Sequence, residues 1–150
     1  YKAYANATQT VAKTQQIIML YDAAIRNLQQ AKEAMRDRRI EERYKLLTKA
    51  SDIIYGLQGC LDFEKGGEVA QVLYDYYSSI DRRMFSLHTH SDISAYDRLI
   101  QDLKSMRDVW EEIDRGASEA EGDADALQEM PAASGGNTSA GNNGNVIISA

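Results

Sequence analysis

The chain has 150 residues, 43% of them hydrophobic, and a formal net charge of −6 at pH 7. That length suits one domain with a core of its own, and the charge argues against a nucleic-acid partner, because no basic surface is indicated. The single cysteine, Cys60, excludes an intrachain disulfide and fits a reducing compartment. No apolar run approaches the ~20 residues of a membrane span and no signal peptide opens the sequence, so we expect no membrane insertion.

In residues 17–35, apolar side chains recur at spacings of three and four residues, which is the period of one buried helix face. This stripe consists of Ile17, Tyr21, Ala24, Leu28, Ala31 and Met35. Ile18 and Ile25 lie beside it and widen the apolar surface beyond what a single neighbouring helix needs. We predict a helix over residues 14–37 that contacts more than one neighbour, preceded by an arm at 1–13.

Helical periods also predict helices over residues 40–61, 68–87 and 92–114. Their main stripes are Ile40, Tyr44, Leu47, Ala50, Ile54, Leu57 and Leu61; Val69, Leu73, Tyr76, Ile80, Met84 and Leu87; and Ile93, Tyr96, Ile100, Leu103, Met106, Trp110 and Ile113. Surplus apolar residues flank the stripes of the second and third helices, namely Leu46, Ile53, Cys60, Val72, Tyr74 and Tyr77. We expect Gly66 and Gly67 to separate these two helices and Gly116 to end the last one.

From residue 117 onward the composition changes. Residues 1–116 hold all 17 lysines and arginines and have a net charge of −1, whereas residues 117–150 hold no basic residue and have a net charge of −5. Gly, Ser, Asn and Ala dominate this segment, which also holds the only proline, Pro131. Such a composition cannot bury enough apolar area to offset the entropy of ordering, so we predict a flexible tail over 117–150.

Four amphipathic helices joined by short links predict an all-α fold, an antiparallel up-down-up-down four-helix bundle over residues 14–116. A flexible N-terminal arm precedes it and a low-complexity acidic tail follows it. The surplus apolar rows leave alternatives open. They belong either to a groove for a partner, to a homodimer interface, or to the core of the subunit itself.

The sequence shows no catalytic constellation, and we expect neither enzyme activity nor a cofactor. Cys60 lies on an apolar face, so we predict a small buried hydrophobic residue rather than a nucleophile. The alternative is a metal-binding or phosphotransfer bundle that uses His88 and His90. These histidines lack the Glu-x-x-His pattern of di-iron bundles and stand at a helix end, which favours the reading as solvated link residues.

Residues 19–25, Met-Leu-Tyr-Asp-Ala-Ala-Ile, resemble the Met-Leu-Tyr-Asp-Gly-Ala-Ile signature of the flagellar secretion chaperone family FliS. Further similarities follow in order: Ala-Tyr at 3–4, Leu-Asp-Phe-Glu-Lys-Gly-Gly-Glu-Val-Ala at 61–70, Leu-Tyr-Asp-Tyr at 73–76 and Val-Trp-Glu-Glu-Ile at 109–113. The resemblance covers residues 3–115. The chain departs from the family at residues 11–13, where Val-Ala-Lys replaces the usual Ala-Ser-Pro, and at Ala23, which replaces a glycine.

The resemblance implies a cytoplasmic chaperone that binds the disordered C-terminal segment of flagellin, prevents its premature polymerisation and helps to deliver it to a component of the flagellar export gate. It implies a four-helix bundle and no cofactor. The client would wrap around the bundle, and the N-terminal arm would cover part of the same groove. We expect a monomer or a weak homodimer.

We predict that the client groove involves the surplus apolar residues, with Tyr4 of the arm docking in or near it through its ring. The groove set is Ile18, Ile25, Leu46, Ile53, Tyr74 and Tyr77. Through the resemblance, Tyr21 and Asp22 of the signature join this flagellin-binding set. A further hypothesis concerns the tail, whose Val-Ile-Ile cluster at 146–148 would fold back into the groove and compete with the client.

Overall fold

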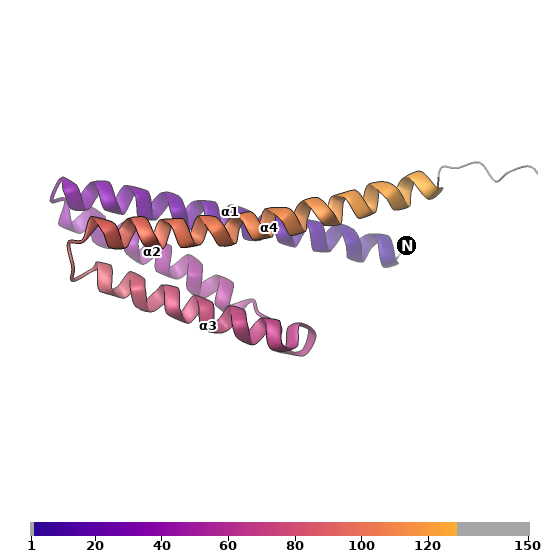
Figure 1. The fold of residues 1–150 in the computed structure, drawn as a ribbon, viewed down its shortest axis with the longest axis horizontal. Coiled ribbons are helices and arrows are strands. Elements are labelled where there is room, and N and C mark those ends of the chain that lie inside the picture. Colours follow the sequence, from indigo (N-terminus) through magenta and orange to yellow (C-terminus); the bar gives the residue numbers. More distant parts are fainter. Residues whose placement is uncertain (1, 129–150) are drawn as a thin grey trace, which may run out of the picture.

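The computed structural model describes the backbone of residues 2–128 and the side chains of residues 13–126. The helices are α1 (Lys2–Arg36), α2 (Ile40–Gly59), α3 (Phe63–Leu87) and α4 (Ile93–Gln128), and residues 2–128 contain no strand. Successive helices run in opposite directions, with α1 and α4 side by side (Figure 1). The predicted all-α, antiparallel up-down-up-down bundle is confirmed.

The core forms where the apolar stripes of the four helices meet. Its largest fully buried side chains are Tyr21, Leu28, Leu47, Ile54, Tyr77, Ile80, Met84, Leu87, Tyr96, Leu99 and Leu103. Burial of each such side chain stabilises the fold by roughly 1.5–3 kcal/mol before entropy is counted. Within this apolar layer the Tyr21 hydroxyl donates a hydrogen bond of 2.9 Å to the Tyr77 hydroxyl, which satisfies two polar groups that burial has removed from water.

Polar side chains and one left-handed residue shape the links. Arg38 has a φ of 58° and lets the chain turn from α1 into α2. The Asp62 carboxylate accepts hydrogen bonds of 3.0 Å from the backbone N–H groups two and three residues on, and so caps the start of α3. Asp92 accepts a similar bond of 2.9 Å before α4. These short links hold neighbouring helices antiparallel.

Three helix boundaries differ from the predicted ones. The segment predicted as an N-terminal arm is helical from Lys2, and α4 does not end at Gly116 but continues to Gln128. Both stretches lack proline and contain helix-forming residues, and each of the exposed glycines of α4, Gly116 and Gly122, costs the helix only about 1 kcal/mol. α3 begins at Phe63 because Asp62 caps it there, and the predicted break appears as a kink at Gly67 (φ 51°, ψ −125°), with the predicted helix 68–87 following it. Residues 129–150 of the predicted tail lie outside the described residues.

Several apolar residues predicted to be buried are exposed. Ile40, Tyr44 and Val69 stand at or near the ends of their stripes, where neighbouring helices leave them largely uncovered. Cys60 follows the last residue of α2 and is also exposed, so the prediction that it is buried was wrong. The apolar stripes therefore extend further than the core that they build, and side chains remain open at the ends of the bundle.

Candidate functional site: an apolar groove at the open end of the bundle

An apolar cavity of about 560 Å³ opens at the end of the bundle where α2 is linked to α3. We call it the apolar groove. All four helices and the α2–α3 link supply its walls, chiefly through Ile17, Leu57, Leu61, Val69, Leu73 and Trp110. Asp62, Lys65 and Cys60 are the polar groups on its wall. Because most of the lining is aliphatic or aromatic, the groove suits an apolar segment of a partner rather than a polar metabolite.

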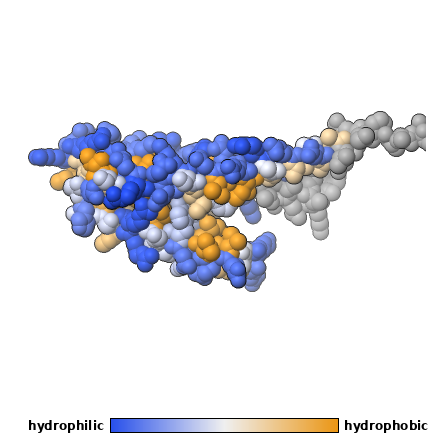
Figure 2. All heavy atoms as spheres, viewed as in Figure 1, coloured by the Kyte–Doolittle hydropathy of each residue, from blue (hydrophilic) through white to orange (hydrophobic). Residues whose placement is uncertain are grey.

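The groove is open because the helices have different lengths and packing. α1 and α4 project together beyond the α2–α3 link (Figure 1), while α3 lies close to α2 and touches α4 little. Ile17 of α1 and Trp110 of α4 therefore pack against the core and still border the groove. Figure 2 shows apolar side chains on both sides of the hollow between the start of α3 and the projecting part of α4.

A separate, smaller hollow of about 270 Å³ lies at the seam between α3 and α4. Tyr76, Met106 and Val109 line it. The Tyr76 hydroxyl is buried and has no hydrogen-bond partner within the described part of the chain. Burial raises the pKa of Tyr76, and the neighbouring Tyr77 raises it further, so this hydroxyl is neutral at physiological pH.

The structure distributes the predicted site residues over three environments. Tyr21, Ile25, Leu46 and Tyr77 lie in the core, whereas Ile18, Asp22 and Ile53 are half-buried. Tyr74 is exposed, and its ring packs on Phe63 with a centroid distance of 5.9 Å. The backbone of Tyr4 lies in α1, but its side chain lies outside the described residues. Among the predicted residues whose side chains are described, Tyr77 is the one that lines the groove.

Most apolar residues that line the groove were assigned by sequence reasoning to the main stripes, whereas Cys60 and Tyr77 belong to the surplus rows. Ile17 and Val69 begin their stripes and Trp110 is the next-to-last residue of its stripe, and these three side chains meet at one end of the bundle. A signal was present in the sequence: the predicted first and fourth helices both carry apolar residues at the end that faces the Gly-Gly link. An antiparallel arrangement brings those ends together.

Asp22 is engaged within the protein. Its carboxylate accepts a hydrogen bond of 2.7 Å from Nε of Arg107, which also pairs with Glu111 at 2.5 Å. Hydrogen bonding to Asp22 raises the pKa of the Arg107 guanidinium. This network ties α1 to α4 beside the groove, so in this structure Asp22 positions helices.

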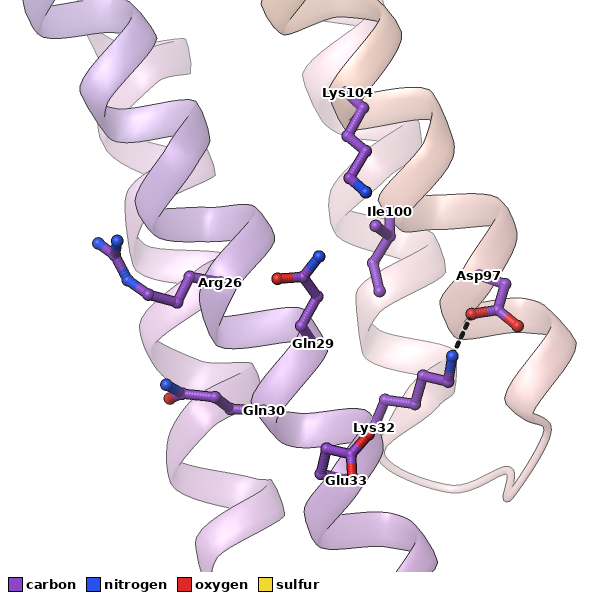
Figure 3. A pocket seen from close by; sticks show the side chains of 8 residues that line it. All are labelled: Arg26, Gln29, Gln30, Lys32, Glu33, Asp97, Ile100 and Lys104. Carbon is purple, nitrogen blue, oxygen red and sulfur yellow. Dashed lines mark hydrogen bonds and ion pairs between the residues drawn. The ribbon is translucent and has the colours of Figure 1, made fainter.

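Another hollow, of about 500 Å³, has a mostly polar lining and lies between side chains of α1 and α4 (Figure 3). Arg26, Lys32 and Lys104 line it together with Asp97, whose carboxylate pairs with Lys32 at 2.5 Å. Mixed charges of this kind form a solvated helix face rather than a site for one ligand.

His88 and His90 stand at the other end of the bundle. His88 is half-buried against Tyr44, with ring centroids 5.3 Å apart, and burial lowers its pKa, as does the neighbouring Arg43. His90 is exposed and contacts the Ser86 carbonyl at 3.0 Å. The described residues contain no group of three or more potential metal ligands. Nothing in this arrangement supports the metal-binding or phosphotransfer alternative.

An all-helical bundle with an open apolar groove is typical of a class of proteins that bind segments of other proteins. A family model described as "Flagellar protein FliS" matches residues 1–117, and the chain belongs to this family. The expected family is thereby confirmed, and with it membership in a family of flagellar secretion chaperones. No helix within residues 2–128 is long and apolar enough to cross a membrane.

Curated relatives agree with this assignment. The flagellar secretion chaperone FliS of Salmonella typhimurium is 32% identical over 123 residues, which cover 78% of this chain and 91% of the relative. That of Campylobacter jejuni is 29% identical over 114 residues, 75% of this chain and 89% of the relative. That of Vibrio cholerae is 32% identical over 95 residues, 63% of this chain and 70% of the relative.

Proposed function

We propose that the protein is an export chaperone that binds the disordered C-terminal segment of flagellin in the cytoplasm. Binding prevents premature polymerisation and aids delivery of flagellin to the flagellar type III export apparatus, through contact with a component of the export gate. The observation that carries the proposal is the apolar groove, in which side chains from all four helices stay open to a partner. The relatives are named flagellar secretion chaperones, which supports the same role.

The chemistry of the groove fits a client that assembles through amphipathic helices. Such a segment exposes apolar side chains before assembly, and the groove covers them temporarily. Each Å² of apolar surface removed from water contributes about 25 cal/mol, but ordering a flexible client costs several kcal/mol. A long contact is therefore required, and the separate hollow at the α3–α4 seam offers the client further apolar surface. The protein acts by binding alone, as a monomer or weak homodimer, without a catalytic step or cofactor.

Two valines of α3 allow a matched test. Val69 and Val72 have the same exposed fraction, 66%, but Val69 lines the groove and Val72 does not. In titration calorimetry with a peptide of the flagellin C-terminal segment, Val69→Asp should weaken binding at least about tenfold, which is ~1.4 kcal/mol. Val72→Asp should stay within about twofold of the unchanged protein.

Both substitutions introduce the same charge at an exposed position of one helix, so their melting temperatures should be similar. Equal affinity of the two variants for the peptide would show that the client does not use the groove. If the unchanged protein fails to bind the peptide at all, the proposed client is wrong.

A further inference from the structure

The apolar groove and the end of α4 stand in a simple geometric relation. α4 passes the groove at Trp110 and continues to Gln128, beyond the α2–α3 link (Figure 1). A helical rise of 1.5 Å per residue places Gln128 roughly 27 Å from Trp110 along the helix axis. The chain thus leaves α4 at the same end of the bundle at which the groove opens.

The sequence after Gln128 contains a tether and an apolar end. Residues 129–145 are rich in Gly, Ser, Asn and Ala, the composition of linkers, and residues 146–148 are Val-Ile-Ile. The linker, 17 residues long, and the Val-Ile-Ile cluster both lie outside the described part of the chain. A linker of this length and composition has a root-mean-square end-to-end distance of roughly 21–25 Å. This reach nearly matches the distance back to the groove, the condition under which the effective concentration of a tethered ligand is highest.

We propose that the Val-Ile-Ile segment at residues 146–148 of the same chain binds in the apolar groove and competes with the client. The groove takes aliphatic side chains, and 146–148 is the one cluster of consecutive large aliphatic residues after α4. Competition rests on the proposed function, whereas occupation of the groove does not. The tail then covers the exposed apolar lining until a longer client segment, which makes more contacts, displaces it.

The expected effect is modest. At an effective concentration of about 1 mM and an intrinsic dissociation constant of about 0.5 mM, the tail occupies the groove roughly two-thirds of the time and weakens client binding about threefold. A client with a long contact surface overcomes this competition, but weak unrelated apolar segments do not.

Cys60 provides a readout that is independent of any client, because it is the only cysteine, is exposed and lines the groove. In the full chain, V146D/I147D/I148D should raise the rate at which a bulky maleimide labels Cys60 about threefold. It should also tighten binding of the flagellin C-terminal peptide about threefold. The matched control N142D/N143D/N145D adds the same charge beside the segment but keeps the apolar residues, and should change neither value.

The outcomes separate the two proposals. Equal labelling rates and equal peptide affinities for both triple variants would overturn the tethered competitor while leaving the client site intact. A faster labelling rate without peptide binding to any variant would support the tail contact and reject flagellin as the client. Protection of Cys60 that weakens on dilution would mean that the tail of a second copy fills the groove, and would overturn contact within one chain.

Discussion

Two buried tyrosines join α1 to α3 through their hydroxyl groups. The Tyr21 hydroxyl donates to the Tyr77 hydroxyl at 2.9 Å, and both side chains lie in the core. Tyr77→Phe would leave the Tyr21 hydroxyl buried without its acceptor, so we expect a loss of about 1–3 kcal/mol in the free energy of unfolding. Replacing both tyrosines by phenylalanine should cost less than the sum of the two single changes. Urea unfolding of the unchanged protein, the two single variants and the double variant measures these free energies. Strict additivity would show that the hydrogen bond between the two hydroxyls has no coupling energy.

Buried tyrosines also set the response of the fold to alkali. Burial raises the pKa of Tyr21, Tyr77 and Tyr96, and the neighbouring Tyr77 adds to the effect on Tyr21. The unfolded chain loses these protons near pH 10, before the folded protein does, so stability is retained below that pH and falls as the pH rises above it. Each such tyrosine contributes at most about 1.4 kcal/mol per pH unit to the fall.

Tyr96 allows this pH dependence to be tested, because its hydroxyl has no hydrogen-bond partner in the described part of the chain. Tyr96→Phe should preserve stability at pH 8 and make the decline between pH 10 and 11 less steep. An unchanged slope in urea midpoints measured across this range would exclude a role for the Tyr96 hydroxyl.

Single residues show where sequence reasoning succeeds and where it does not. Tyr21 and Leu28 recur at helical spacing, and that spacing is sufficient to predict their burial. Val69 has the same helical spacing within the stripe of α3 but remains exposed. Periodicity identifies the apolar face of a helix, but it does not give the length of the neighbouring helix that covers this face. The groove is built from residues of this second kind. Spacing alone therefore predicted apolar surplus but assigned it mostly to other residues.

At the scale of elements, the kink in α3 depends on Gly67. Its φ of 51° and ψ of −125° lie where residues with a Cβ are strained. We expect Gly67→Ala to lower the free energy of unfolding by roughly 1–3 kcal/mol. Gly56 is the matched control, since it lies inside α2 with helical geometry and a Cβ there would meet nothing within 4 Å.

Gly56→Ala should be neutral or stabilise the protein by up to about 1 kcal/mol, because alanine has the higher helix propensity. Thermal unfolding followed by circular dichroism distinguishes the two variants. Equal melting temperatures would indicate that the chain around Gly67 adapts to a side chain without strain.

Element existence and order could be predicted from the sequence, but element ends could not. The four apolar stripes lie on the observed helices, except that Leu61 falls in the α2–α3 link. The break expected at Gly67 appears as a residue with non-helical geometry inside α3, whereas the break expected at Gly116 lies within α4. Glycine weakens a helix by an amount that a capping aspartate or a neighbouring helix can offset. The Asp62 cap has this effect at the start of α3.

At the scale of the whole molecule, the bundle combines a closed core with an open end. Tyr77 belongs to both regions, because it is buried in the core and its ring also borders the groove. The fold class followed from four helical stripes and short links, but the position of the groove depends on how far α3 lies from α4. The distance between α3 and α4 is set by the packing of side chains from several helices, so the apolar pattern of one helix does not predict it.

Cys60 permits the most direct measurement of where a client binds, because one label can be attached at the edge of the groove. A photoactivatable benzophenone on Cys60 should form cross-links to the flagellin C-terminal segment. The control is the C60S/Y55C variant, which moves the label to an exposed position of α2 that does not line the groove. Mass spectrometry should find abundant cross-links from position 60 and few from position 55. Equal cross-linking from both positions, or cross-links from position 55 alone, would contradict a client site in the apolar groove.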